Sequence, residues 1–369
     1  MQASRWAGED APRLPAISTV RARAVDVPMA RPLRTASGSI STAPLILLDV
    51  VTESGLVGHS YLFAYSRLMM PAMVSIVREL APELAGESIA PGRRMRDMRR
   101  RFRLLGTQGL LGMVISGIEM ALWDVLGKLL GRPVADLLGG EAVALRAYDS
   151  YGMVDLPRDE AAIRESVESG FRAVKIKIGY PDAADDVAVV RRVREIVGPE
   201  IDLMVDYNQS LDPPEACRRI ERLREFDLYW VEEPVAAEDL AGHSLVRRVT
   251  GARIQTGENW WFPEGCQAAI AASAGDFAML DLMKIGGFTG WMLAAGQAHA
   301  ASLPVSSHLF VEASAHAMAV TPTGDWVEHF DLAGAILEAP CRPVDGHITA
   351  TGPGLGITWN EEAIARYAL

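Results

Sequence analysis

Three acidic residues in the second half of the chain each directly follow a short apolar run, and together they could bind a metal ion. They are Asp206, Glu232 and Glu258. If the runs are strands of a parallel barrel, their carboxyl ends share one rim and the three carboxylates converge there. Converging like charges raise their own pKa values unless a cation neutralises them, and hard oxygen ligands favour Mg²⁺, with Mn²⁺ as an alternative. The competing interpretation, unrelated acids at helix N-termini, weakens when three follow in succession.

Two lysines upstream of these acids could act as bases. The segment from Val174 to Ile178 alternates aliphatic residues with lysines, so Lys175 and Lys177 lie on one face of a strand. In a barrel the aliphatic face meets the helices, which turns both lysines inward. Lysine is rarely buried without a partner, and we expect burial beside a metal to depress the pKa of one of them and yield a base at neutral pH. An edge strand with solvated lysines is the alternative.

A histidine and an aspartate end two later apolar runs. Asp281 and His308 would occupy neighbouring rim positions, where the carboxylate can orient the imidazole for proton transfer. A lone histidine is more often a satisfied core residue, but this pairing favours a catalytic role. The remaining histidines are expected to be structural: His59, His243, His299, His316, His329 and His347.

Two more polar residues fall at strand ends. Glu328 ends the last apolar run, and a closed barrel would place it next to Ser150 on the first strand. If protonated, Glu328 would donate a hydrogen bond to a carboxylate that is gaining negative charge. Asn208, two residues past Asp206, could contact a substrate hydroxyl. Both could instead be ordinary polar residues.

The elements that must position these side chains follow a βα repeat. Between residues 146 and 335, short apolar strands and helical stretches alternate roughly every 25 to 30 residues, as βα units require. Eight strands can be counted, which predicts an α/β protein with a closed (β/α)₈ barrel as its catalytic domain. The strands are expected to end near Ser150, Ile178, Asp206, Glu232, Gly257, Asp281, Ser307 and Glu328.

The segments before and after the predicted barrel lack its alternation of strands and helices. Residues 1–17 read as a flexible tail, and residues 18–145 place strands before helices, as in an α+β capping domain. Within that domain we expect an antiparallel meander over 20–27, 44–51 and 57–61, and a core helix over 110–129. Residues 336–369 are expected to pack back on the cap.

Composition narrows the class of function. The chain has 369 residues and a net charge of −11, which argues against a nucleic-acid surface because phosphate binding needs clustered basic residues. Cys217, Cys266 and Cys341 are far apart, so neither a disulfide framework nor a thiolate zinc site is indicated. No signal peptide and no run of about 20 apolar residues is evident. We therefore expect a cytoplasmic protein without membrane contact.

The chain resembles the enolase superfamily, and within it the mandelate racemase group, from about Ser18 to the C-terminus. Seven short motifs carry the resemblance, in the family's order and spacing: Lys175-Ile-Lys177, Asp206-Tyr-Asn208, Glu232-Glu-Pro234, Gly257-Glu258-Asn-Trp260, Asp281-Leu-Met-Lys284-Ile-Gly-Gly287, Ser306-Ser-His308-Leu and Trp326-Val-Glu328. No single motif would suffice, whereas seven together leave little room for coincidence.

The resemblance implies roles for the residues at the rim. Lys177 and the His308–Asp281 pair would be opposed bases on the two faces of a 2-hydroxy carboxylate, one removing the α-proton and the other returning a proton. Lys175 and the metal would neutralise the ene-diolate, and Glu328 would donate to it.

The resemblance also assigns the substrate pocket. Asn208 and Ser150 would place polar groups of the substrate, residues of about 31 to 42 would form a lid, and Tyr65 would lie near the ligand. This chain departs from the mandelate racemase pattern at four pocket positions, which are Leu33, Ser37, Ile40 and Tyr151. A polar serine and a bulky tyrosine could reshape the pocket for a different or smaller side chain.

These inferences predict a magnesium enzyme that racemises mandelate or a related 2-hydroxy acid. The first alternative is an acid-sugar dehydratase, in which the same ene-diolate expels a 3-hydroxyl with His308 as the acid. A barrel that binds carboxylates without catalysis is a second. A metal-dependent hydrolase would need a His-x-His after the first strand, where the chain has Tyr148-Asp149-Ser150-Tyr151. The expected partners are a small carboxylate and further copies of the chain in a homo-oligomer.

Overall fold

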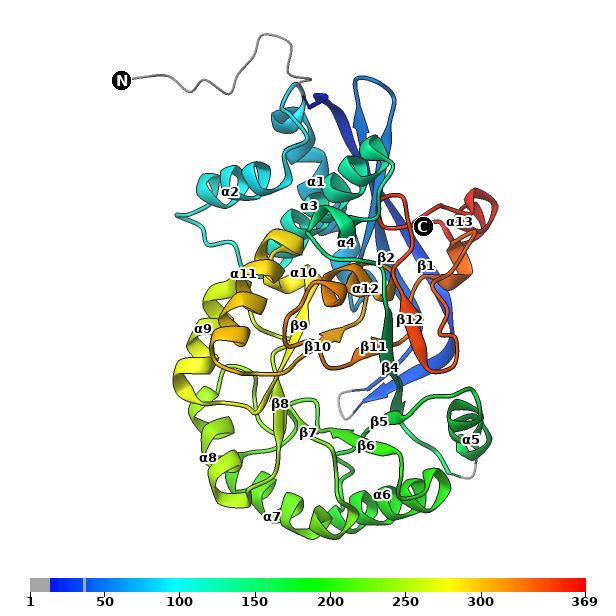
Figure 1. Cartoon of the computed structure of the whole chain (residues 1–369), viewed down its shortest axis with the longest axis vertical. Coiled ribbons are helices and arrows are strands. Elements are labelled where there is room, and N and C mark those ends of the chain that lie inside the picture. The colour runs from blue at the N-terminus through cyan, green and yellow to red at the C-terminus, as the bar shows by residue number, and fades with distance from the viewer. Residues whose placement is uncertain (1–13, 36–37, 157) are drawn as a thin grey trace.

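The structure is a computed structural model that describes residues 14–35, 38–156 and 158–369. Most of the predicted tail, residues 1–13, lies outside the described residues, as does Ser37. In Figure 1 the N-terminal elements form the upper part of the molecule and a barrel forms the lower part.

The cap is a three-stranded antiparallel sheet covered by helices. Its strands are β1 (Ile17–Thr35), β2 (Gly38–Thr52) and β3 (Val57–Phe63), paired in the order β1-β2-β3. Its helices are η1 (Arg67–Met69), α1 (Met70–Leu84), α2 (Pro91–Arg101), α3 (Leu110–Leu130) and α4 (Val134–Leu137). The predicted meander is confirmed. The first two strands run further than predicted, so the described part of the expected lid is a continuation of the β1–β2 hairpin.

Helix α3 is the core helix of the cap. It ends where Gly131 adopts a left-handed φ of 62°, a conformation that glycine reaches without the Cβ clash of other residues. By length and composition α3 is apolar enough to cross a membrane, so the sequence-based statement that no run qualifies is wrong. Most of the helix is buried inside the fold, as expected for a core helix.

The catalytic part is a nearly closed barrel of parallel strands, which confirms the predicted fold. The strands are β4 (Ala144–Met153), β5 (Ala173–Lys177), β6 (Asp202–Asp206), β7 (Val231–Glu232), β8 (Ile254–Thr256), β9 (Phe277–Asp281), β10 (Val305–His308) and β11 (Val327–His329). They pair in the order β10-β9-β8-β7-β6-β5-β4-β11. The remaining seam, between β10 and β11, is joined where Ser307 N donates to Trp326 O at 3.1 Å.

Helices surround the barrel and set its inner and outer layers. They are α5 (Glu160–Glu168), α6 (Ala183–Val197), α7 (Pro213–Leu223), η2 (Arg224–Phe226), α8 (Leu240–Thr250), α9 (Phe262–Ala272), α10 (Leu282–Ile285), α11 (Gly287–Ala300) and α12 (Val311–Ala319). Val174 and Ile176 of β5 pack outward in one apolar cluster with residues of these helices. A separate inner cluster, which includes Tyr148, Trp230 and Trp326, fills the barrel.

The C-terminal segment returns to the cap. After η3 (Gly334–Ile336), β12 (His347–Thr349) pairs antiparallel with β4, and α13 (Glu361–Tyr367) lies beside the N-terminal sheet in Figure 1. Leu369 N donates to Ala24 O of β1 at 3.1 Å, and Trp359 Nε1 donates to Asp49 Oδ1 of β2 at 2.8 Å. The domain limits drawn from the sequence remain predictions.

Two glycine-to-alanine substitutions should change the free energy of unfolding in opposite directions, one through a steric clash and the other through better helix formation. A Cβ on Gly58 of β3 would lie 2.2 Å from Ala121 O and 2.4 Å from a Val125 methyl, so Gly58→Ala should lower the free energy of unfolding by about 1–3 kcal/mol or more. Gly296 of α11 is exposed, and a Cβ added there would have no neighbour within 4 Å. Gly296→Ala should therefore raise the free energy of unfolding by about 0.4–1 kcal/mol. Denaturant unfolding measures both, and equal effects would contradict the packing described for β3 against α3.

Candidate active site

The three predicted metal ligands meet at the carboxyl end of the barrel. Asp206 and Glu232 are the last residues of β6 and β7, and Glu258 lies in the loop after β8. All three are buried, and one oxygen from each lies within 4.8 Å of the others. A set of three hard carboxylate oxygens at this spacing fits Mg²⁺ or Mn²⁺ and no soft metal.

Both lysines point into the barrel, as the alternation predicted. Lys175 Nζ donates to Glu232 Oε1 at 2.8 Å and lies 3.0 Å from Glu328 Oε1, while Lys177 Nζ donates to Asp206. Burial has the largest single effect and lowers the pKa of Lys177, but the charges of Asp206, Glu258 and Glu232 together outweigh it and the pKa is raised. The pKa of Lys175 is raised in the same way by Glu232 and Glu328. In this arrangement each ammonium contacts a carboxylate, and the depressed pKa expected beside a bound metal stays a prediction.

The histidine and aspartate form the predicted pair. His308 Nδ1 lies 2.6 Å from Asp281 Oδ2, and His308 Nε2 lies 3.1 Å from Glu258 Oε2. Asp281 is itself held because its Oδ1 accepts hydrogen bonds from the backbone N–H groups of Met283 and Lys284, at the start of α10. Burial lowers the pKa of His308, whereas Glu258 and Asp281 raise it by more. A fixed carboxylate thus orients the ring and leaves Nε2 directed at the carboxylate cluster.

Glu328 lies on the rim as predicted, but in the ionised form. Leu309 N donates to its Oε2 at 2.9 Å, and a hydrogen bond with Ser150 also favours the charged form. Burial raises its pKa, yet the charges of Lys175 and His308 outweigh this and lower the pKa to about 2. The role considered for a protonated Glu328, donating a hydrogen bond, does not match this state; here the carboxylate accepts.

Two predicted substrate contacts are also brought to the rim. Asn208 has a left-handed φ of 44°, and its backbone N and Nδ2 donate to Asp206 at 2.7 and 2.9 Å. Its Oδ1 is buried without a hydrogen-bond partner. Tyr65 of the cap lies beside Lys284, whose Nζ is 5.1 Å from the centre of the tyrosine ring.

The other predicted pocket positions in the described residues are Tyr151, Leu33 and Ile40. Tyr151 packs in the outer apolar cluster with Ile163, and its hydroxyl donates to Ala162 O at 2.8 Å, so its ring does not join the inward groups of the rim. Leu33 and Ile40 face each other across the β1–β2 hairpin and are partly buried. Their pairing places two apolar side chains on the arm that reaches the barrel.

A further polar network behind the metal ligands was not anticipated. Asn259 Nδ2 donates to Glu258 Oε1 at 3.1 Å and to Glu233 Oε2 at 2.8 Å, and Asn259 Oδ1 accepts from Lys284 Nζ at 2.5 Å. Gln255 Nε2 also donates to Glu232, at 3.0 Å. The sequence offered a hint of this network, because Glu233, Asn259 and Lys284 stand inside the motifs quoted above, beside or near the expected site residues.

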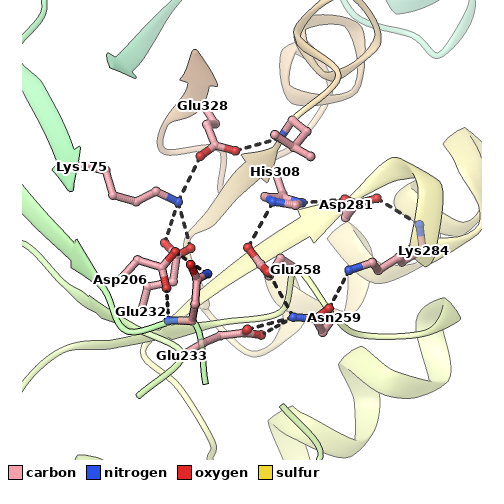
Figure 2. Close-up of polar contacts among 12 residues, drawn as sticks. Lys175, Asp206, Glu232, Glu233, Glu258, Asn259, Asp281, Lys284, His308 and Glu328 are labelled. Carbon is pink, nitrogen blue, oxygen red and sulfur yellow. Dashed lines mark hydrogen bonds and ion pairs between the residues drawn. The ribbon is translucent and has the colours of Figure 1, made fainter. Parts of the chain in front are cut away.

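Figure 2 shows how these groups are arranged around one centre. Lys175 lies between Glu328 and the carboxylates of Asp206 and Glu232, and His308 contacts Glu258. Lys177 contacts Asp206, so the lysine and the histidine contact different carboxylates of the cluster. Two basic groups thus lie next to the prospective metal site, each in contact with a different ligand.

Family models match almost the whole chain. The description of the first is mandelate racemase / muconate lactonizing enzyme, N-terminal domain, over residues 17–139; the second is enolase C-terminal domain-like, over residues 158–363. Fold and site together define a capped barrel enzyme with a carboxylate metal centre. The chain belongs to the enolase superfamily.

Related proteins carry several activities. L-talarate/galactarate dehydratase of Salmonella typhimurium is 29% identical over 336 residues, covering 88% of this chain and 82% of the relative. L-Ala-D/L-Glu epimerase of Bacillus subtilis is 29% identical over 357 residues, covering 90% and 94%. The crystal structure of an enolase from Bradyrhizobium, complexed with magnesium and mandelic acid, is 55% identical with a TM-score of 0.94, covering 96% of this chain and 99% of that one. Bound magnesium in that structure agrees with the expected cofactor.

Magnesium should stabilise the folded protein through the three carboxylates. At a free Mg²⁺ concentration 100-fold above its dissociation constant, binding to the folded state alone adds about 2.7 kcal/mol. We expect a higher midpoint of thermal unfolding with Mg²⁺ than with EDTA, and we expect Glu232→Gln to abolish the difference.

The matched control is Asp186→Asn, which alters an equally buried carboxylate that accepts from Gly179 N and Tyr180 N outside the cluster. This variant should be less stable but keep the magnesium shift. A shift that survives in Glu232→Gln would place the bound ion elsewhere.

Proposed function

We propose that this protein racemises a 2-hydroxy carboxylate, mandelate or a close relative, by moving its α-proton. The observation that carries the proposal is that Lys177 and His308 both reach the carboxylate cluster and contact different members of it, Asp206 and Glu258. A substrate held between them would present one face to each base. Two bases on two faces are what a 1,1-proton transfer requires.

The carboxylates prepare the substrate for loss of its proton. Asp206, Glu232 and Glu258 would hold Mg²⁺, which when bound supplies a Lewis acid that withdraws charge from the substrate carboxylate. Lys175 adds a second positive charge, because its ammonium is buried and held by Glu232 and Glu328. Both effects favour the ene-diolate over the starting acid, since its negative charge is greater.

The proton then moves between the substrate and the two bases. With one enantiomer, the neutral Nζ of Lys177 would take the α-proton and Nε2–H of His308 would return a proton to the opposite face. With the other enantiomer the two roles exchange. Asp281 keeps Nε2 directed at the site because it holds Nδ1 at 2.6 Å. A divalent cation bound by Asp206 would compete for the carboxylate that raises the pKa of Lys177, which favours release of its proton.

The side chain of the substrate is proposed to be apolar. Leu33 and Ile40 present aliphatic groups on the hairpin that reaches the barrel. The similar Bradyrhizobium enolase was crystallised with mandelic acid, an aromatic 2-hydroxy acid. Both observations support an aromatic or other apolar group at the α-carbon.

The second candidate is dehydration of an acid sugar. Relatives named as dehydratases include the arabinonate dehydratase of Saccharolobus solfataricus, 27% identical over 342 residues, which covers 88% of this chain and 90% of the relative. The same proton abstraction would then be followed by loss of the 3-hydroxyl, with Nε2–H of His308 as the acid. The product would be a 2-keto acid.

An experiment in deuterated water distinguishes racemisation from dehydration. With Mg²⁺ present, we expect each enantiomer of mandelate to exchange its α-proton for deuterium and to racemise, as read by proton NMR and chiral chromatography. Acid sugars tested in parallel should yield no semicarbazide-reactive 2-keto product. Formation of that product without exchange of any 2-hydroxy acid would replace racemisation with dehydration.

Removing one base should uncouple exchange from racemisation. Lys177→Met and His308→Asn should each lose racemisation by about 10²-fold or more, since general-base contributions are of that order. Each variant should still exchange the α-proton of the one enantiomer that faces its remaining base. Unchanged turnover in Lys177→Met would contradict the two-base scheme, and complete absence of turnover in the unaltered protein would favour a barrel that only binds carboxylates.

A further inference from the structure

An arginine of the cap reaches across to the first strand of the barrel. Arg31 of β1 donates from Nη1 to Asp149 Oδ2 at 3.0 Å and from Nη2 to Asp149 Oδ1 at 2.6 Å. Two parallel hydrogen bonds between a guanidinium and a carboxylate fix direction as well as distance. The guanidinium also lies 4.1 Å from the centre of the Tyr151 ring. The cap and β4 are thereby joined through one side chain.

The hairpin backbone is shaped to present this arginine. Pairing of β1 with β2 is regular up to Pro28 opposite Thr42 and resumes at Leu33 opposite Ile40. Four residues of β1 (29–32) therefore stand against one residue of β2. A bulge of this kind bends a strand and redirects its side chains. Arg31 lies within it.

The acceptor carboxylate is part of the barrel rim. Asp149 is buried, precedes Ser150 on β4, and accepts from Ser166 Oγ at 2.6 Å. Its Oδ1 lies 3.1 Å from Nδ1 of His329, the residue after Glu328 on β11. His329 therefore has a carboxylate partner that was not foreseen. Burial raises the pKa of Asp149, but His329 and Arg31 outweigh it and hold the pKa well below its ordinary value.

The hairpin backbone also touches the rim directly. A Cβ on Gly152 of β4 would lie 2.6 Å from Arg34 N, so β4 and β1 approach as closely as only glycine permits. A pocket of about 220 Å³ remains between hairpin and rim, with Arg31, Ser150 and Phe330 in its lining. A shift of the hairpin would change this pocket beside Ser150.

A second arginine of the same hairpin provides a comparison. Arg34 lies 3.9 Å from Asp155 and 3.6 Å from Asp159, and neither contact is a hydrogen bond. Partly exposed ion pairs at such distances contribute little to stability. Arg31 is the arginine with short, bidentate bonds to a buried acceptor.

We propose that Arg31 is a positioning residue whose paired hydrogen bonds to Asp149 seat the β1–β2 hairpin on the strands that carry Ser150 and Glu328. Through this contact Arg31 sets how tightly the substrate side chain is enclosed. The effect on substrate rests on the proposed function, whereas the seating of the hairpin does not. Arg31 itself contacts none of the prospective metal ligands or bases in the described part of the chain.

The test compares Arg31→Met with Arg34→Met. Arg31→Met should raise KM for mandelate on the order of 10- to 100-fold with a smaller change in kcat, because misplacement of a positioning group costs up to that much. Amide hydrogen exchange in residues 28–35 and 38–42 should become faster by about tenfold or more. Arg34→Met should leave both unchanged.

Further variants keep the result decisive. Arg31→Lys retains the charge but loses the paired hydrogen bonds, so its KM and its amide exchange rates should lie between those of Arg31→Met and Arg34→Met. If Arg31→Met fails to fold, Arg31→Lys takes its place in the test. Asp149→Asn combined with Arg31→Met should be no worse than Asp149→Asn alone, since the two residues act as one unit.

Two readouts separate failure of this proposal from failure of the proposed function. If the unaltered protein does not racemise any 2-hydroxy acid, the exchange rates of the hairpin still decide whether Arg31 seats it. If hairpin exchange in Arg31→Met equals that of the unaltered protein, the proposal is overturned whatever the turnover. An unchanged magnesium shift in thermal unfolding would show that the metal site of each variant is intact.

Discussion

Three carboxylates buried within 4.8 Å of one another are the constraint on which the rest of the site depends. Their mutual repulsion and loss of hydration would be prohibitive without compensating charge. Within the described residues the protein supplies that charge in pairs: Lys175 contacts Glu232, Lys177 contacts Asp206, and His308 contacts Glu258. Two of the groups that balance the carboxylates, Lys177 and His308, are therefore also the groups proposed to transfer protons. The same contacts therefore stabilise the site and support its proposed chemistry.

A parallel barrel can hold this charge because alternate residues of each strand face inward at different depths. On β5 the inward residues Ala173, Lys175 and Lys177 pass from the apolar inner cluster to the charged rim within five residues. Large side chains such as Trp230 fill the interior below the rim. This filling excludes water from beneath the site, which strengthens the electrostatic interactions above it.

The cap completes the rim from outside the barrel. Its hairpin pairs Leu33 with Ile40, and Arg31 joins that hairpin to Asp149. The C-terminal segment holds the cap in turn, since Trp359 and Leu369 hydrogen-bond to β2 and β1. Cap, barrel rim and C-terminal segment are thus joined to one another although they come from separate stretches of the chain.

The sequence alone predicted the barrel, the three acids at its rim, the inward lysines and the pairing of His308 with Asp281. Those features follow from short-range rules, because a strand alternates every two residues and a strand end lies where an apolar run stops. Other features depend on distances between residues far apart in the chain. Lys177 and Glu328 acquire their charge states from partners on other strands, Tyr151 turns to the outer layer, and Arg31 meets Asp149 across 118 positions. Only the folded structure brings those groups within hydrogen-bonding distance, so only it decides their pKa values and contacts.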